Sequence, residues 1–444
     1  MTDLLTPQLN SRPSVPEWLQ ARRLAGRAAW YNSRLPTRKY EDWKYTSLHP
    51  LQQEFTPAPA SEASATELAL DLPKLTGNLL VFVNGHWRED LSSLTAEDSG
   101  LELVRFSNAS QEQSDLITEH LGTALVDSKP LFAMLNDAAL SEGVLLRVRA
   151  NCRSQHPVQI VWHTSNASSC YITNHRLLVL AEAQSEATLI EHFSGSASAF
   201  TNSISELNLA PDAKLNHSRL HLESGEAMHI GGVHARLERN STLESFHLAV
   251  GGKLKRIDIA INHQGSGAHC QLDGVYLLRE QEHVDYHTCI EHAVPECTTD
   301  ENFRGIVGDR ARAVFNGRIH IHPNAQNTRA ELSNKNLLTS ANAEVNTKPE
   351  LEIYADDVQC AHGATVAQLS DAMLHYMETR GIPADEAKVL LSYGFINSLL
   401  ESHAIESLHH YLKPLLKHYF GSVGEAQAGS AEAAVLTRHI GGEL

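Results

Sequence analysis

The sequence predicts a mainly β fold in which a long solenoid of strands lies between helical ends. From about Gly143, apolar and polar residues alternate with a period of two for about 200 residues, as in half-buried strands. In this region a small polar turn, a small residue and a strand recur, with Ala187, Ala213, Thr242 and Ala268 spaced by 26, 29 and 26 residues. A strand repeat of roughly 20–50 residues is typical of a solenoid, whose turns bury their apolar faces by stacking.

The next repeat interval, from Ala268 to Ala311, is 43 residues and predicts an additional turn or an insertion. On pattern alone, a β-sandwich remains the alternative. We expect four regions: a mostly helical N-terminal domain with a short hairpin, the β-helix core, a C-terminal helical domain, and a disordered tail rich in Gly, Ala and Glu. Their bounds are 1–142, 143–366, 367–420 and 421–444.

Helical periodicity and turn residues define the N-terminal elements. A helix is expected over Trp18–Trp30, before Pro36. Leu79–Val83 followed by Asn84-Gly85 predicts a strand and a tight hairpin turn. The apolar spacing in Gln113–Leu140 predicts one further helix.

The C-terminal region returns to helical periodicity. One helix is expected over Leu369–Thr379, with Gly381 as its cap, and another begins at Asp385 and ends at Glu401. A third is expected over Ile405–Phe420. Apolar residues occupy nearly every side of the second helix, so it is either deeply packed or covered by a partner. The candidate partner-binding residues are Tyr393, Ile396 and Leu400.

Composition and charge exclude several classes of function. With 36 basic and 53 acidic residues, the net charge of −17 argues against binding to nucleic acid or to an anionic membrane surface. No apolar run approaches the roughly 18–20 residues of a membrane span. The N-terminus lacks the basic and apolar regions of a secretory signal, so we expect a cytoplasmic protein.

The cysteines are scattered and do not form a self-sufficient metal site. There are six, and none forms a C-x-x-C pair or the four-cysteine spacing of a ferredoxin. We therefore expect reduced, mostly buried thiols and no tightly bound cluster in the isolated chain. His320 and His322 would share one strand face, which we interpret as a polar face. P-loop, G-x-S-x-G and H-E-x-x-H motifs are absent from the sequence.

The segment Pro349–Val366 carries the strongest chemical signal. Its alternating pattern predicts a half-buried strand, and it presents Cys360 and His362 two residues apart. Because side chains two apart on a strand point to the same face, thiol and imidazole would lie side by side. They supply half of a soft-metal site, so other ligands must complete it.

Three blocks resemble the SufB/SufD family of iron–sulfur cluster assembly scaffolds, and more closely its SufD branch. The first is Leu35–Leu48 (LPTRKYEDWKYTSL). The second is Val314–Asn327 (VFNGRIHIHPNAQN), followed by Asn336–Ser340 (NLLTS). The third is Asn346–Thr365 (NTKPELEIYADDVQCAHGAT), the longest and most specific, followed by the helical run to Glu401.

The resemblance implies a right-handed parallel β-helix and a non-enzymatic scaffold. It implies that Cys360 and His362 help to acquire iron and build a transient iron–sulfur cluster, shared with a SufB-like paralogue that contacts the β-helix. It also implies that a SufC-like ATPase docks on the C-terminal helices. The SufB branch has a carboxylate straight after the corresponding histidine, whereas this chain has Gly363 and would supply fewer ligands. Cluster type, flavin binding to the complex and homodimer formation by the isolated chain stay open.

A β-helix carbohydrate-active enzyme, a lyase or hydrolase acting alone, is the alternative. Such enzymes use paired carboxylates, and Asp356-Asp357 precedes the key strand segment. Adjacent strand residues point to opposite faces, which argues against their cooperation. The cysteine-bearing strand and the missing export signal favour the scaffold.

Overall fold

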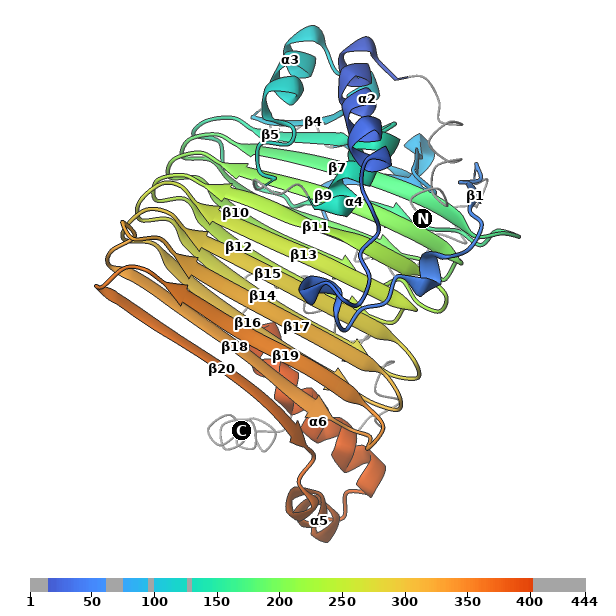
Figure 1. Ribbon diagram of the computed structural model, residues 1–444, viewed down its shortest axis with the longest axis vertical. Helices are drawn as coiled ribbons and strands as arrows, with labels where there is room; N and C mark the ends of the chain where they lie inside the picture. Colours follow the sequence, from blue (N-terminus) through green and yellow to red (C-terminus); the bar gives the residue numbers. More distant parts are fainter. Residues whose placement is uncertain (1–14, 61–74, 95–99, 126–129, 402–444) are drawn as a thin grey trace.

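The computed structural model describes residues 15–60, 75–94, 100–125 and 130–401. Two facing ten-stranded sheets, named here sheet A and sheet B, form a flattened solenoid (Figure 1). Eight consecutive strand pairs, from β5/β6 to β19/β20, make its turns, and all strands stacked along it are parallel. The mainly β solenoid with helical ends is therefore confirmed.

The strands alternate between the two sheets along the chain. Sheet A contains β1 (Thr56–Pro57), β4 (Leu101–Arg105), β5 (Val144–Val148), β7 (Tyr171–Ala181), β9 (Ala199–Leu209), β11 (Met228–Leu237), β13 (Leu254–His263), β15 (His283–His292), β17 (Arg312–Ile321) and β19 (Glu344–Ile353). Sheet B contains β2 (Asn78–Val83), β3 (His86–Trp87), β6 (Val158–His163), β8 (Glu186–Ser194), β10 (Lys214–His221), β12 (Thr242–Val250), β14 (His269–Leu278), β16 (Thr298–Val307), β18 (Thr328–Leu338) and β20 (Val358–Gln368).

The sequence repeat marks one corner of the solenoid, where the chain passes from sheet A to sheet B; we call it the first corner. The first seven of its eight turns each contain a residue with positive φ, a conformation that Asn, Asp and Gly adopt most readily. These residues are Asn151, Gln184, Asp212, Asn240, Gly267, Glu296 and Asn327.

The long repeat interval has a simple geometric origin. Ala268 follows a first corner, and its counterpart one turn later is Cys297, because Thr298 pairs with His269. Ala311 instead follows the opposite corner, between β16 and β17. The 43-residue interval therefore spans one whole turn and part of the next, and the predicted insertion or additional turn is wrong.

The two ends of the solenoid differ. At the N-terminal end, β4 pairs antiparallel with β5, and β3 pairs antiparallel with β2 through the predicted hairpin turn at Asn84 and Gly85. At the other end, β19 pairs with β17 and β20 pairs with β18. Neither last strand has a second strand partner within the described residues.

Helices α2 (Glu17–Tyr31), α3 (Gln111–His120) and α4 (Leu131–Ala139) lie near the N-terminal end of the solenoid (Figure 1). The single helix expected over Gln113–Leu140 is wrong, because the structure has two. The first begins at a capping box on Ser110 and gives way to Gly122 with φ of 90°. The second begins after Pro130.

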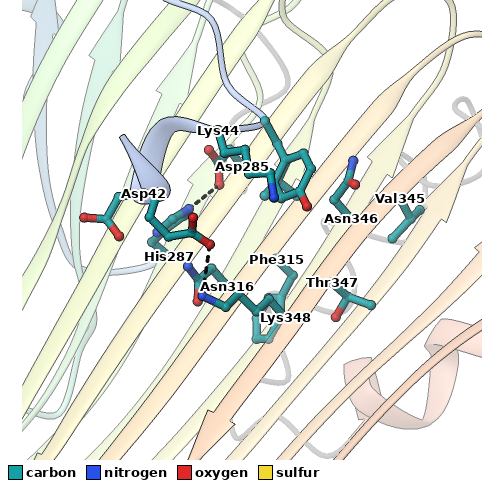
Figure 2. Close-up of a pocket in the computed structure, with 13 residues that line it drawn as sticks. Asp42, Lys44, Asp285, His287, Phe315, Asn316, Val345, Asn346, Thr347 and Lys348 are labelled. Atoms are coloured by element: carbon teal, nitrogen blue, oxygen red, sulfur yellow. Dashed lines mark hydrogen bonds and ion pairs between the residues drawn. The ribbon is translucent and has the colours of Figure 1, made fainter. Parts of the chain in front are cut away.

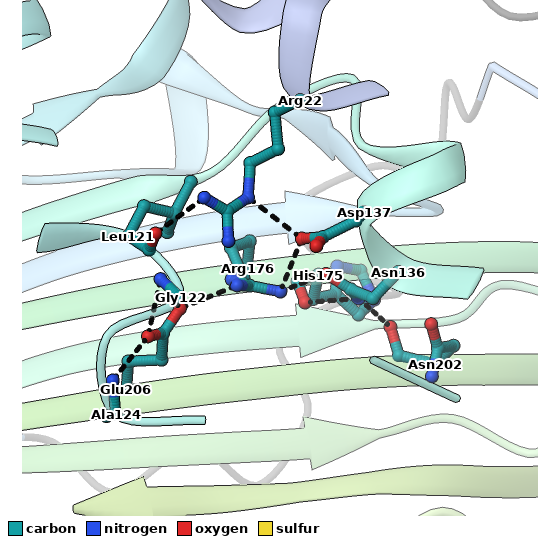
Figure 3. Close-up of polar contacts among 10 residues, drawn as sticks. All are labelled: Arg22, Leu121, Gly122, Ala124, Asn136, Asp137, His175, Arg176, Asn202 and Glu206. Atoms are coloured by element: carbon teal, nitrogen blue, oxygen red, sulfur yellow. Dashed lines mark hydrogen bonds and ion pairs between the residues drawn. The ribbon is translucent and has the colours of Figure 1, made fainter. Parts of the chain in front are cut away.

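A buried ionic network holds these helices on the outer face of sheet A (Figure 3). Arg176 on β7 pairs with Glu206 on β9 at 2.6 Å, and both side chains are fully buried. The Glu206 carboxylate accepts hydrogen bonds from the Gly122 amide at 2.7 and 2.8 Å. Asp137 on α4 pairs with both Arg176 and Arg22 of α2, at 3.3 and 3.0 Å. The charges therefore join three helical segments to two strands.

The C-terminal helices α5 (Asp371–Thr379) and α6 (Ala384–Glu401) follow the last strand. Gly381, with φ of 85°, lies between them as expected. Apolar residues of α6 pack on sheet B, against a cluster that includes Phe246, Val275 and Ile306. No helix in the described ranges is long and apolar enough to cross a membrane. The third helix expected over Ile405–Phe420 and the tail 421–444 lie outside the described residues.

The interior of the solenoid is apolar along most of its length but contains charges in the middle turns. Arg219 and His217 on β10 lie 3.5 and 3.2 Å from the buried Glu191 carboxylate on β8. Ser205 donates to the same carboxylate at 2.8 Å. Burial alone would raise the pKa of Glu191, but Arg219 and His217 outweigh it and hold the pKa at about 2. Glu191 is therefore ionised at neutral pH, and its charge depends on these partners.

Replacing Arg219 by leucine should lower the free energy of unfolding by about 3–5 kcal/mol, because Glu191 loses its buried counter-charge. The double variant Arg219→Leu/Glu191→Gln should recover part of this loss. Urea denaturation measures both. Arg239→Leu is the matched control, because its pair with Asp212 is exposed and should contribute less than about 1 kcal/mol. A loss for Arg219→Leu no larger than for the control would contradict the assignment.

Candidate functional site at the open end of the solenoid

Cys360 and His362 lie on β20, the last strand of sheet B. Their register partners on β18 are Ala330 and Leu332, which belong to the main apolar core. The two side chains therefore share the face that points into the solenoid, as the spacing predicts. Cys360 is half-buried against this core, whereas His362 is exposed because no further turn covers it.

Burial has a chemical consequence for the thiol. It raises the pKa of Cys360 above the ordinary value, and a hydrogen bond from the Ala330 backbone only partly offsets the effect. The thiol is therefore protonated at neutral pH in this chain alone. Metal binding must displace that proton, because the thiolate is the ligand form.

Three groups of histidine, cysteine and carboxylate side chains bring three donor atoms within 4.8 Å of one another in the described residues. Neither Cys360 nor His362 belongs to any of them. The groups are Glu291 with His320 and His322, His263 with His292 and Cys297, and His221 with Glu223 and His229. Two of the three lie at the first corner, on the same edge of the solenoid as the start of β20.

The sequence analysis noted His320 and His322 but interpreted them as a polar face, and it missed Glu291. Register explains the convergence, because Glu291 on β15 pairs directly with His320 on β17. Glu291 precedes His320 by 29 residues, one turn of the repeat. A search for histidine and acidic residues that lie one repeat length apart would have found this group.

The three predicted partner-binding residues lie on α6. Ile396 is fully buried and Leu400 is 6% exposed, both within the apolar cluster on sheet B. Tyr393 is half-buried beside the same cluster. Arg304 of β16 fixes this part of α6 by donating to Ser398 at 2.7 Å. Two large apolar side chains of the C-terminal helices are exposed, Tyr376 on α5 and Leu390 on α6.

The carboxylates Asp356 and Asp357 occupy the turn between β19 and β20 and are exposed. The Asp357 backbone accepts from the Asn327 amide at 2.6 Å and donates to the Gln326 side chain at 2.8 Å. These bonds join the turn between β19 and β20 to the turn between β17 and β18. Their visible role is thus to shape the turn that leads into β20.

A cavity of 320 Å³ lies between the N-terminal segment and the last turns of sheet A (Figure 2). Its lining comes from all three sequence blocks: Asp42 and Lys44 from the first, Asn316 from the second, and Asn346 and Lys348 from the third. The blocks, far apart in sequence, therefore meet in space.

Polar contacts tie the N-terminal segment to the solenoid beside this cavity. Thr46 hydrogen-bonds to Asp285, and Arg256 pairs with the same carboxylate at 2.9 Å. Arg256 also donates to the Asp42 carbonyl at 2.7 Å. Burial would raise the pKa of Asp285, but Arg256 and His287 lower it well below its usual range. Asp285 is thus an ionised anchor for the segment.

The described chain is thus an open-ended β-solenoid with a thiol and an imidazole on its last strand. The description "SUF system FeS cluster assembly, SufBD core domain" matches residues 163–395, and "SufBD protein N-terminal region" matches residues 10–160. The chain belongs to the SufBD family of iron–sulfur cluster assembly proteins.

Curated relatives agree with this assignment. The iron–sulfur cluster assembly protein SufD of Escherichia coli is 33% identical over 384 residues, which cover 84% of this chain and 86% of that protein. The protein SufD of Bacillus subtilis is 26% identical over 414 residues, covering 90% and 94%. A SufBD family protein of Synechocystis is 28% identical over 394 residues, covering 86% of each. The carbohydrate-active alternative is not favoured.

Alkylation of Cys360 by iodoacetamide should be slow at neutral pH and should rise only at a higher pH than for an ordinary cysteine, because burial raises the pKa of this thiol. Peptide mass spectrometry of the full chain at a series of pH values measures the rate at this residue. The same peptide in urea is the control and should show the midpoint of an ordinary cysteine, about pH 8.5. Identical midpoints in the folded and unfolded chain would contradict the raised pKa.

Proposed function

We propose that this chain is a non-enzymatic scaffold subunit of a SufB–SufC–SufD-type assembly complex. It helps to acquire iron and to form a nascent iron–sulfur cluster at its contact with a SufB-like paralogue. The observation that carries the proposal is the position of Cys360 and His362 on the edge strand at the open end of the solenoid, on the face that points into it. The family assignment and the SufD relatives support it.

The open strand edges supply a way to bind the paralogue. Within the described residues, β19 and β20 each leave a row of backbone donors and acceptors without a strand partner, on the side away from β17 and β18. A second solenoid of the same kind can continue both sheets by strand addition, which brings its own ligands next to Cys360 and His362. The cluster is then shared and transient, since neither subunit closes the coordination shell. In the absence of the paralogue, the same edges can pair two copies of this chain.

Alanine at Cys360 or His362 should leave the fold intact, because both residues lie at the end of the core. Either substitution should lower the free energy of unfolding by about 1–3 kcal/mol at most. Cluster formation on the co-expressed complex should fall in each variant and fall further in the double variant. Iron and sulfide analysis of the purified complex, with thermal melting as a parallel readout, tests this expectation. Unfolding of the single variants would make the pair structural and refute the site.

We propose that the SufC-like ATPase docks on the outward side of α5 and α6. Tyr376 and Leu390 are 51% and 38% exposed, and they are the large apolar side chains that α5 and α6 present to solvent in the described residues. Tyr393, Ile396 and Leu400 support the docking helix from its inner side. A direct contact of Ile396 and Leu400 with the ATPase stays a prediction, and it requires α6 to leave the sheet.

Aspartate at Tyr376 or Leu390 should abolish pull-down of the ATPase while the melting temperature stays within a few degrees of wild type, because a charge in a desolvated interface is costly. Ile396→Asp should abolish the pull-down and also lower the melting temperature, because it places a charge in the core. Lys388→Asp, on an exposed polar position of α6, is the matched control. Undiminished pull-down by the Tyr376 and Leu390 variants would move the docking surface elsewhere.

A further inference from the structure

A second set of metal-ligand side chains lies on the outer face of sheet A, two turns from the open end. The Glu291 Oε2 atom on β15 is 2.6 Å from His320 Nδ1 on β17 and 2.8 Å from His322 Nε2 beyond its end. The two imidazole rings are 4.2 Å apart, between centroids. Two imidazoles and one carboxylate therefore converge on a single point.

The surroundings hold the carboxylate in place and leave the group reachable. Arg318 donates to the other oxygen of Glu291 at 2.8 Å, which turns Oε2 toward the two histidines. Side-chain exposure is 16% for Glu291, 18% for His320 and 40% for His322, so an ion can enter from solvent.

The local charge also favours a cation. Arg318 is neutralised by Glu352, which it binds through two hydrogen bonds of 2.8 and 2.9 Å. With neutral histidines, the formal charge of Glu291, Glu352 and Arg318 together is −1.

We propose that Glu291, His320 and His322 form a binding site for a divalent first-row cation, Fe²⁺ or Zn²⁺. Two histidines and one carboxylate with open positions are the ligand set that proteins use for both ions. In a tetrahedral shell, metal–ligand bonds of about 2.0–2.2 Å place neighbouring ligand atoms about 3.3–3.6 Å apart, so the ion fits after the Glu291 oxygen and the histidine nitrogens separate by about 1 Å or less. The site is distinct from Cys360 and His362, and its occupancy does not depend on cluster assembly.

The test is calorimetric titration of the full, metal-free chain, purified without a histidine tag, with Zn²⁺ and, under anaerobic conditions, with Fe²⁺. The variants are Glu291→Gln and the double variant His320→Gln/His322→Gln. His375→Gln, exposed on α5, is the matched control. A Cys360→Ala/His362→Ala variant separates this site from the one on β20. Circular dichroism checks that each variant is folded.

One equivalent of cation should bind wild type, the control and the Cys360/His362 variant, with Zn²⁺ bound more tightly than Fe²⁺. Affinity should fall at least about tenfold in the Glu291 and histidine variants. Absence of saturable binding, equal affinity in those variants, or loss only in the Cys360/His362 variant would each overturn the proposal. If a variant fails to fold, the Co²⁺ spectrum of wild type decides: nitrogen and oxygen ligation supports the site, and a thiolate charge-transfer band refutes it.

Discussion

The stacking of turns is the constraint on which the rest of this structure depends. Each strand pair buries its inward side chains only between the turns before and after it, so the two ends cannot both remain open without cost. At one end the antiparallel strands β3 and β4 and the helices α2 to α4 cover the first turns. At the other end β19 and β20 keep free edges in the described part of the chain. The solenoid therefore has two different ends, and under the proposed function its chemistry lies at the end where β19 and β20 keep free edges.

The fold was predictable because its two signals are local. Alternation identified the strands, and small polar turns identified the corners, where the structure shows left-handed residues such as Asp212 and Asn240. Errors arose where a local signal had two meanings. The alanine at position 311 looks like its counterpart at 268 but follows the opposite corner. Likewise, Gln113–Leu140 has helical spacing throughout, yet Gly122 adopts φ of 90° within it.

The chemistry was less predictable than the fold, because ligand groups form across turns. Cys360 and His362 could be found since they lie two residues apart on one strand. Glu291 and His320 are 29 residues apart and meet only because their strands pair in that register. The buried ion pairs of the interior could not be predicted for the same reason. Glu191 and Arg219 lie on paired strands, and no short sequence motif places them together.

The raised pKa of Cys360 links partner binding to metal binding under the proposed function. Alone, the thiol is protonated and His362 is exposed, so the last strand binds a cation weakly. A paralogue that extends the sheets would add ligands, and a bound cation would replace the thiol proton. Docking of the paralogue and coordination of the cation then stabilise each other, because the paralogue supplies further ligands and the cation bridges the two subunits. Separation of the subunits would break the shell and release the cluster, so a scaffold with an incomplete ligand set can deliver what a closed site would retain.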